Sequence, residues 1–116
     1  KQKTAYEMLR NLVVSEMFIS DSIIIKPRFS AFFHTSLDLV LRRPGVDTVV
    51  LAGTTTPNCI RTTCYDALSL DYDVVVLSDC TSSVTDAVQQ ANLDDMARIG
   101  ARVETVAQFE TALSAL

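Results

Sequence analysis

A cysteine stands near the start of an expected helix, directly after an apolar run. The run over residues 46–53 is followed by TTTPNC, so that Thr56 and Pro57 come just before Cys59. Because threonine is favoured at a helix N-cap and proline at the first helical position, Cys59 should be the third residue of the first turn. Unpaired N–H groups and the positive end of the helix dipole stabilise a thiolate there, and the same N–H groups can bind an oxyanion. The indicated chemistry is nucleophilic attack on a carbonyl, while a small buried hydrophobe is the alternative for any lone cysteine.

Helical spacing separates Cys59 from Cys64. Five residues of helix correspond to about 140° of rotation, so the two cysteines lie on different faces. Cys64 shares an apolar stripe with Ile60, whereas Cys59 shares its stripe with Thr63. We therefore expect Cys64 to fill the core, and Cys80, which follows an expected strand, stays ambiguous.

Lys26 is the second residue with chemical potential. It follows a run of three isoleucines, and ligands of open parallel sheets gather beyond the carboxyl ends of the strands. A lysine at a strand end can also simply extend into solvent. Phe29 and Phe33 come soon after Lys26 and either join the core or line a pocket. We interpret His34, the single histidine, as a loop residue rather than as a partner of Cys59.

Apolar runs alternate with amphipathic stretches, and together they predict the elements that position these side chains. A cap at residues 35–38 opens one helix, which should bury Leu37, Val40 and Leu41 and end at Pro44. The continuous aliphatic character of the strands is typical of a parallel sheet covered on both faces. The order strand–helix–strand predicts an α/β fold with three αβα layers and a doubly wound, mostly parallel sheet. The expected strands cover residues 22–26, 46–53, 73–78 and 102–106, and the other expected helices cover residues 4–14, 57–70, 85–99 and 108–116.

Composition excludes several classes of protein. The 116 residues suit one domain, and a hydrophobic content of 48% excludes disorder. The net charge of −4 comes without a basic cluster, so we expect no nucleic-acid partner, and no apolar stretch is long enough for a membrane span or a secretory signal. Three cysteines without disulfide or zinc spacing indicate a reduced, cytoplasmic setting and no metal. Three glycines are too few for a Gly-rich nucleotide loop.

Two blocks of this sequence resemble those of the isochorismatase-like cysteine hydrolases. Residues 26–38, KPRFSAFFHTSLD, match the pattern KxRxSAFxxTxLD, and residues 50–60, VLAGTTTPNCI, look like the block around that family's nucleophile. Residues 74–79 and 91–100 are similar to the family's closing strand and helix. The resemblance runs in register from about residue 21 to residue 106.

The resemblance implies a doubly wound isochorismatase-like sheet and a Cys–Lys–Asp triad. Cys59 takes the nucleophile position and Lys26 the lysine position. A cis peptide would join Thr54 to Thr55, and the backbone N–H groups of Thr55 and Cys59 would form the oxyanion hole. Thr54 would line a substrate pocket together with Phe29 and Phe33.

This sequence also departs from the family pattern. The family's aspartate lies on an N-terminal strand, and none of Asp21, Asp38 or Asp47 stands in a matching motif. We therefore expect residues 1–116 to form a single isochorismatase-like domain that lacks its N-terminal strands, with the aspartate supplied from upstream. Gln89 occupies a position where many members carry a histidine.

The implied activity is hydrolysis of a C–N bond in a small carboxamide, ureido or N-carbamoyl compound through a thioester. Lys26 would stabilise the thiolate and move protons. We expect a small-molecule substrate, no cofactor, no membrane partner and a homo-oligomeric assembly. Two alternatives stay open: a catalytically dead binding or scaffold domain of the same fold, and a small-molecule-binding α/β module with incidental cysteines.

Overall fold

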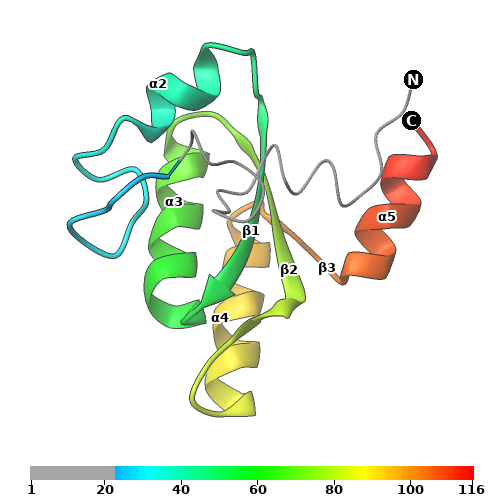
Figure 1. The fold of residues 1–116 in the computed structure, drawn as a ribbon. Coiled ribbons are helices and arrows are strands. Elements are labelled where there is room, and N and C mark those ends of the chain that lie inside the picture. Colours follow the sequence, from blue (N-terminus) through cyan, green and yellow to red (C-terminus); the bar gives the residue numbers. More distant parts are fainter. Residues whose placement is uncertain (1–22) are drawn as a thin grey trace.

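The computed structural model of the protein describes residues 23–116. The helix expected over residues 4–14 lies outside the described residues. The described elements follow the alternating order that the sequence predicts (Figure 1). In chain order they are α2 (Leu37–Arg42), β1 (Thr48–Thr54), η1 (Thr56–Ile60), α3 (Arg61–Ser69), β2 (Asp73–Ser82), α4 (Asp86–Arg98), β3 (Arg102–Glu104) and α5 (Val106–Ser114).

The three strands form a parallel sheet in the order β1-β2-β3. Within the described residues β2 is the central strand, and α3 and α4 connect successive strands. Figure 1 shows α3 and α4 on one side of the sheet and α5 on the other. This arrangement confirms the predicted three-layer α/β architecture.

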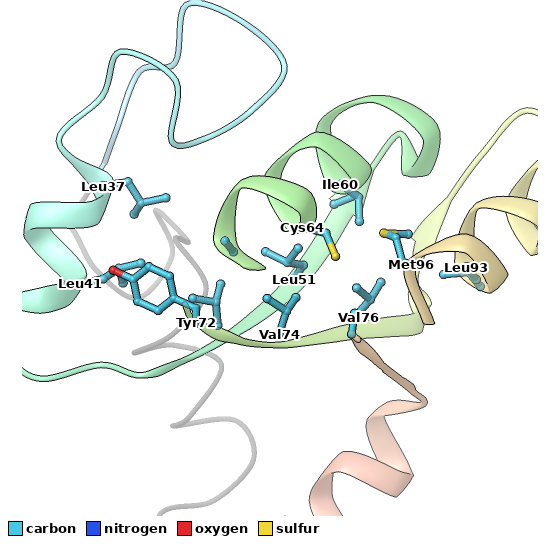
Figure 2. Close-up of a cluster of buried hydrophobic side chains, with 13 residues drawn as sticks. Leu37, Leu41, Leu51, Ile60, Cys64, Tyr72, Val74, Val76, Leu93 and Met96 are labelled. Carbon is cyan, nitrogen blue, oxygen red and sulfur yellow. The ribbon is translucent and has the colours of Figure 1, made fainter. Parts of the chain in front are cut away.

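Side chains along each strand point alternately to the two faces of the sheet, so the core consists of two clusters. Val49 and Leu51 of β1 and Val74 and Val76 of β2 pack against α2, α3 and α4 (Figure 2). The residues between them point to the opposite face and pack against Phe109 of α5. Both faces of each long strand are therefore buried, which explains why the strands are continuously aliphatic.

Tyr72 attaches α2 to this core. Tyr72 is buried, its hydroxyl donates to the Asp38 carboxylate at 2.7 Å, and the Arg42 guanidinium lies 3.9 Å from the centre of its ring. Leu37 and Leu41 are buried as predicted, but Val40 is 38% exposed. The expectation that α2 buries all three aliphatic side chains was therefore wrong at Val40.

The strand predicted over residues 22–26 was wrong. Residues 23–26, the described part of this range, have no regular secondary structure, and the Ile23 and Ile25 side chains are 61% and 90% exposed. A run of β-branched residues becomes a strand only where another strand satisfies its N–H and C=O groups. Within the described residues, the sheet contains β1, β2 and β3 and pairs none of them with this segment.

Several element boundaries also differ from the prediction. β2 extends to Ser82 because a register shift between Leu51 and Gly53 lets Gly53 and Thr54 continue pairing with its end. β3 ends at Glu104, and α5 begins at Val106, because Thr105 and Gln108 form a reciprocal capping box. Among residues 23–116, no helix combines the length and the hydropathy needed to cross a bilayer.

Candidate active site

Cys59 lies in the first turn of the helix that follows β1. This turn, η1, is wider than an α-helical turn: the N–H groups of Ile60 and Arg61 donate to carbonyls five residues earlier. In the same turn the Asn58 N–H donates to the Thr55 carbonyl at 3.0 Å, and the Arg61 N–H also donates to the Asn58 carbonyl. The peptide bond between Thr54 and Thr55 is cis, as the resemblance implied.

The N-cap assigned to Thr56 was wrong. Thr55 is the N-cap residue, the turn begins at Thr56, and Cys59 is its fourth residue rather than its third. The Thr56 hydroxyl is buried and donates to the Ser82 carbonyl at 3.1 Å, so it holds the turn against the end of β2 instead of capping the helix. Gln89 of α4 in turn donates to the hydroxyl of Thr81 at 3.0 Å and holds the same strand end.

The structure brings Lys26 to Cys59. The Lys26 ammonium lies 3.4 Å from the Cys59 Sγ and also donates to the Arg28 carbonyl at 3.0 Å. Cys59 is half-buried and Lys26 is exposed. These two residues come from the two separate blocks that carry the family resemblance. This geometry makes Cys59 the candidate nucleophile and Lys26 its candidate partner.

The segment that follows Lys26 is attached to α3 and α2 through Ala31. The Ala31 N–H donates to the Thr63 Oγ1 at 3.0 Å, and the Ala31 carbonyl accepts from the Thr35 hydroxyl. Thr35 also accepts from the N–H of Leu37 at the start of α2. Sequence reasoning missed the role of Thr63, although it had placed Thr63 on the same helical stripe as Cys59.

A cavity of about 690 Å³ lies between this segment and the first turns of the helix. Phe29 and Phe33 line it, whereas Thr54, Lys26 and Cys59 are not among its lining residues. Thr54 is exposed at the end of β1. The full lining consists of Arg28, Phe29, Ser30, Phe33, Pro57, Arg61, Thr62, Tyr65 and Asp66.

Two arginines line the cavity, and their surroundings differ. Arg61 donates to Asn92 and pairs with Asp95 at 3.1 Å, so α4 neutralises its charge. The Arg28 guanidinium donates to the neighbouring Pro27 carbonyl at 2.8 Å. Sequence reasoning missed Arg61 because its partners lie about 30 residues further along the chain.

The remaining cysteines differ from Cys59 in their surroundings. Cys64 is fully buried and points from α3 toward the strands (Figure 2), and burial raises the pKa of its thiol from 9.0 to about 11 despite the nearby Arg61. Cys80 is exposed as a residue, yet partial desolvation of its thiol and the Asp79 carboxylate raise its pKa. The predicted core position of Cys64 is confirmed.

We expect the free energy of unfolding to fall as the pH rises from about 9 to 11, because Cys64 ionises near 9 when unfolded but near 11 when folded. The folded state then binds more protons than the unfolded state, so stability decreases with pH, by about 2 kcal/mol at pH 11. Urea denaturation of the wild type and of Cys64→Ala across this range measures the effect. The stability advantage of the wild type over Cys64→Ala should shrink with rising pH. If the free energies of unfolding of the two proteins changed in parallel with pH, the raised pKa of Cys64 would be contradicted.

Other candidate groups lie elsewhere. His34 is exposed, and its ring packs against Phe33 at a centroid distance of 4.3 Å. Among residues 23–116, the ion pairs join arginines to Asp38, Asp95 or Glu104, and none involves Lys26. The same residues contain no group of three or more histidine, cysteine, aspartate or glutamate side chains that could hold a metal ion.

Comparison with known proteins places this geometry in a family. The model of the isochorismatase domain matches residues 1–108, a longer range than the two sequence blocks indicated. The chain is 41% identical over 109 residues to a probable inactive nicotinamidase of Arabidopsis thaliana, covering 93% of this chain and 55% of that protein. It is 37% identical over 95 residues to the ureidoacrylate amidohydrolase RutB of Methylorubrum extorquens, covering 81% of this chain and 38% of the relative.

A solved structure agrees with these matches. The isochorismatase family protein from Desulfovibrio vulgaris superposes with a TM-score of 0.77 at 44% identity, covering 80% of this chain and 49% of that one. The chain thus spans about half the length of the Arabidopsis relative and of this neighbour. The match to the domain model and the shared fold lead to one conclusion: the chain belongs to the isochorismatase family.

Proposed function

We propose that the protein is a cysteine-dependent hydrolase that cleaves a C–N bond of a small carboxamide, ureido or N-carbamoyl compound. The observation that carries the proposal is the 3.4 Å contact between the Lys26 ammonium and the Cys59 sulfur. A thiolate at the first turn of a helix, with a cation beside it, is suited to attack a carbonyl carbon.

The reaction proceeds in two steps. The Cys59 thiolate adds to the carbonyl carbon, and the N–H groups of Thr55 and Cys59 stabilise the resulting oxyanion. The C–N bond then breaks, the nitrogen leaves as ammonia or an amine after taking up a proton that Lys26 delivers, and a thioester remains on Cys59. Water attacks this thioester and gives one proton back to Lys26, the C–S bond breaks, the acid product leaves, and Cys59 is a thiolate again.

The relatives and the cavity support the proposed substrate class. One relative is a ureidoacrylate amidohydrolase and another is a probable inactive nicotinamidase, and both names refer to an enzyme class that acts on a small compound with a C–N bond. Phe29 and Phe33 line a cavity next to the Lys26 segment and would contact the acyl part of the substrate. The aspartate that completes this catalytic triad belongs to the same domain and lies outside residues 23–116. A cytoplasmic location and a homo-oligomeric assembly stay predictions.

The test is to trap the thioester. The protein is mixed with a panel of ureido acids and primary carboxamides, and released ammonia is measured alongside the mass of acid-quenched protein. We expect a substrate-dependent mass increase that peptide mapping assigns to Cys59 and that hydroxylamine removes. Turnover of a panel member with an acyl group on another residue would contradict the mechanism.

The second candidate is a catalytically dead binding domain of the same fold. The observation that favours it is the probable inactive nicotinamidase among the relatives. Iodoacetamide labelling at pH 7 separates the two candidates, because an activated thiolate reacts faster than ordinary thiols. One rapidly labelled cysteine, Cys59, is expected for the enzyme, whereas equal slow labelling of Cys59 and Cys80 is expected for the inactive domain.

A further inference from the structure

We propose that Thr63 is a positioning residue that holds Lys26 against Cys59, an inference that rests on the proposed function of this pair. The relevant contact is the hydrogen bond from the Ala31 N–H to the Thr63 Oγ1 at 3.0 Å. Within the described residues, Lys26 donates to Arg28 and Cys59 and not to Thr63. It acts through the segment that carries the lysine.

The segment between Lys26 and Ala31 has no regular secondary structure of its own. Apart from its two contacts with the helix after β1, its hydrogen bonds within residues 23–116 span at most four residues. Lys26 donates to the Arg28 carbonyl, Arg28 donates to the Pro27 carbonyl, and Ser30 and Ala31 accept from residues 32, 33 and 35. Among the hydrogen bonds described for residues 23–33, those that reach the helix after β1 are Lys26 to Cys59 and Ala31 to Thr63. Ile24 and Phe32 pack against the core on either side of this stretch, and the hydrogen bond at Ala31 is the further contact that sets how Lys26 meets the helix.

The helix presents both contacts on one face. Cys59 and Thr63 are four residues apart, about one turn, so their side chains lie one above the other. Along this face Cys59 receives the Lys26 ammonium, and Thr63 receives the Ala31 N–H. Thr63 is 6% exposed, so water does not readily replace its hydroxyl as the partner of Ala31.

Thr63→Val removes the acceptor and keeps the β-branched shape. The Ala31 N–H then loses its partner, and the segment shifts to recover a hydrogen bond. Because a displacement of about 1 Å can cost 10²-fold in rate, we expect kcat to fall about tenfold or more. KM should rise by a smaller factor than kcat falls, because the shift moves Phe29 at the edge of the cavity but acts mainly on the contact between the reacting pair.

Rescue and a matched control separate positioning from a general structural effect. Thr63→Ser retains the hydroxyl and should restore most of the rate. Thr111→Val makes the same chemical change at an exposed position of α5, where the hydroxyl donates within its own helix, and should leave activity unchanged. Loss of rate in Thr63→Ser equal to that in Thr63→Val, with both variants folded, would overturn the proposal.

Alkylation of Cys59 by iodoacetamide at pH 7 tests the coupling without any substrate. Thr63→Val should slow this alkylation in the wild-type background and have no further effect when combined with Lys26→Met. Equal slowing in both backgrounds would show that Thr63 acts independently of the lysine. Since this measurement needs no turnover, the positioning role can succeed or fail separately from the hydrolase activity.

Discussion

Replacing Cys59 with serine should lower the rate of hydrolysis by at least about 10³-fold, because removing a nucleophile eliminates the covalent route. A serine hydroxyl stays protonated near neutral pH, and the Lys26 ammonium, which lies 3.4 Å from the Cys59 sulfur, would not ionise it. Folding should be retained, because Cys59 is only half-buried and serine is nearly isosteric. Steady-state ammonia release and thermal unfolding of the purified variant measure the two quantities.

The other two cysteines provide matched controls. Cys64→Ala alters the core beneath the same helix, and Cys80→Ser alters an exposed thiol at the end of β2. Both variants should keep the rate within about threefold as long as they remain folded. If either of them lost as much activity as Cys59→Ser while still folded, the assignment of the nucleophile would be wrong.

Local signals were sufficient to predict most of the elements. β1 and β2 contain the uninterrupted aliphatic runs 49–52 and 74–77, and such runs are typical of parallel strands that are buried on both faces. α4 is bounded by Thr85, whose hydroxyl accepts from the Val88 N–H, and by Gly100 with a φ of +115°. Both signals are read within a few residues of the element, so distant parts of the chain were not needed.

The prediction of a strand at residues 22–26 was wrong because such an element depends on distant residues. Its three isoleucines have strand propensity, but a strand forms only against a partner that local sequence does not specify. The described residues offer this segment no neighbouring strand, and Ile25 is 90% exposed. The same dependence on distant partners explains why β2 extends past its predicted end, since its last pairs are made with Gly53 and Thr54.

In the candidate site, too, local sequence predicts the single residues but not the contacts between distant ones. Cys59 could be identified from the helix start around it, and Lys26 from the spacing of its block. Their contact joins residues that lie 33 positions apart, so composition and periodicity could not predict its geometry. Thr63 was missed because a threonine inside a helix carries no functional signal until its hydroxyl is seen to accept from Ala31.

Replacing Lys26 with methionine should reduce the rate of hydrolysis by about 10²–10⁴-fold, the usual range for losing a general acid–base group. Methionine keeps the length of the side chain and removes the charge. Lys26 is exposed, so the free energy of unfolding should change by less than about 0.5 kcal/mol. Arg43→Met, which removes an exposed cation at the end of α2, is the matched control and should retain full activity.

A second variant distinguishes the two roles proposed for the lysine. Arginine at position 26 keeps a positive charge beside the sulfur but does not release a proton near neutral pH. Iodoacetamide should therefore alkylate Cys59 faster in Lys26→Arg than in Lys26→Met. Lys26→Arg should nevertheless hydrolyse the substrate almost as slowly as Lys26→Met, because proton delivery to the leaving nitrogen is lost. If Lys26→Arg were fully active, the lysine would act through its charge alone. If Lys26→Met were fully active, the 3.4 Å contact would have no catalytic role.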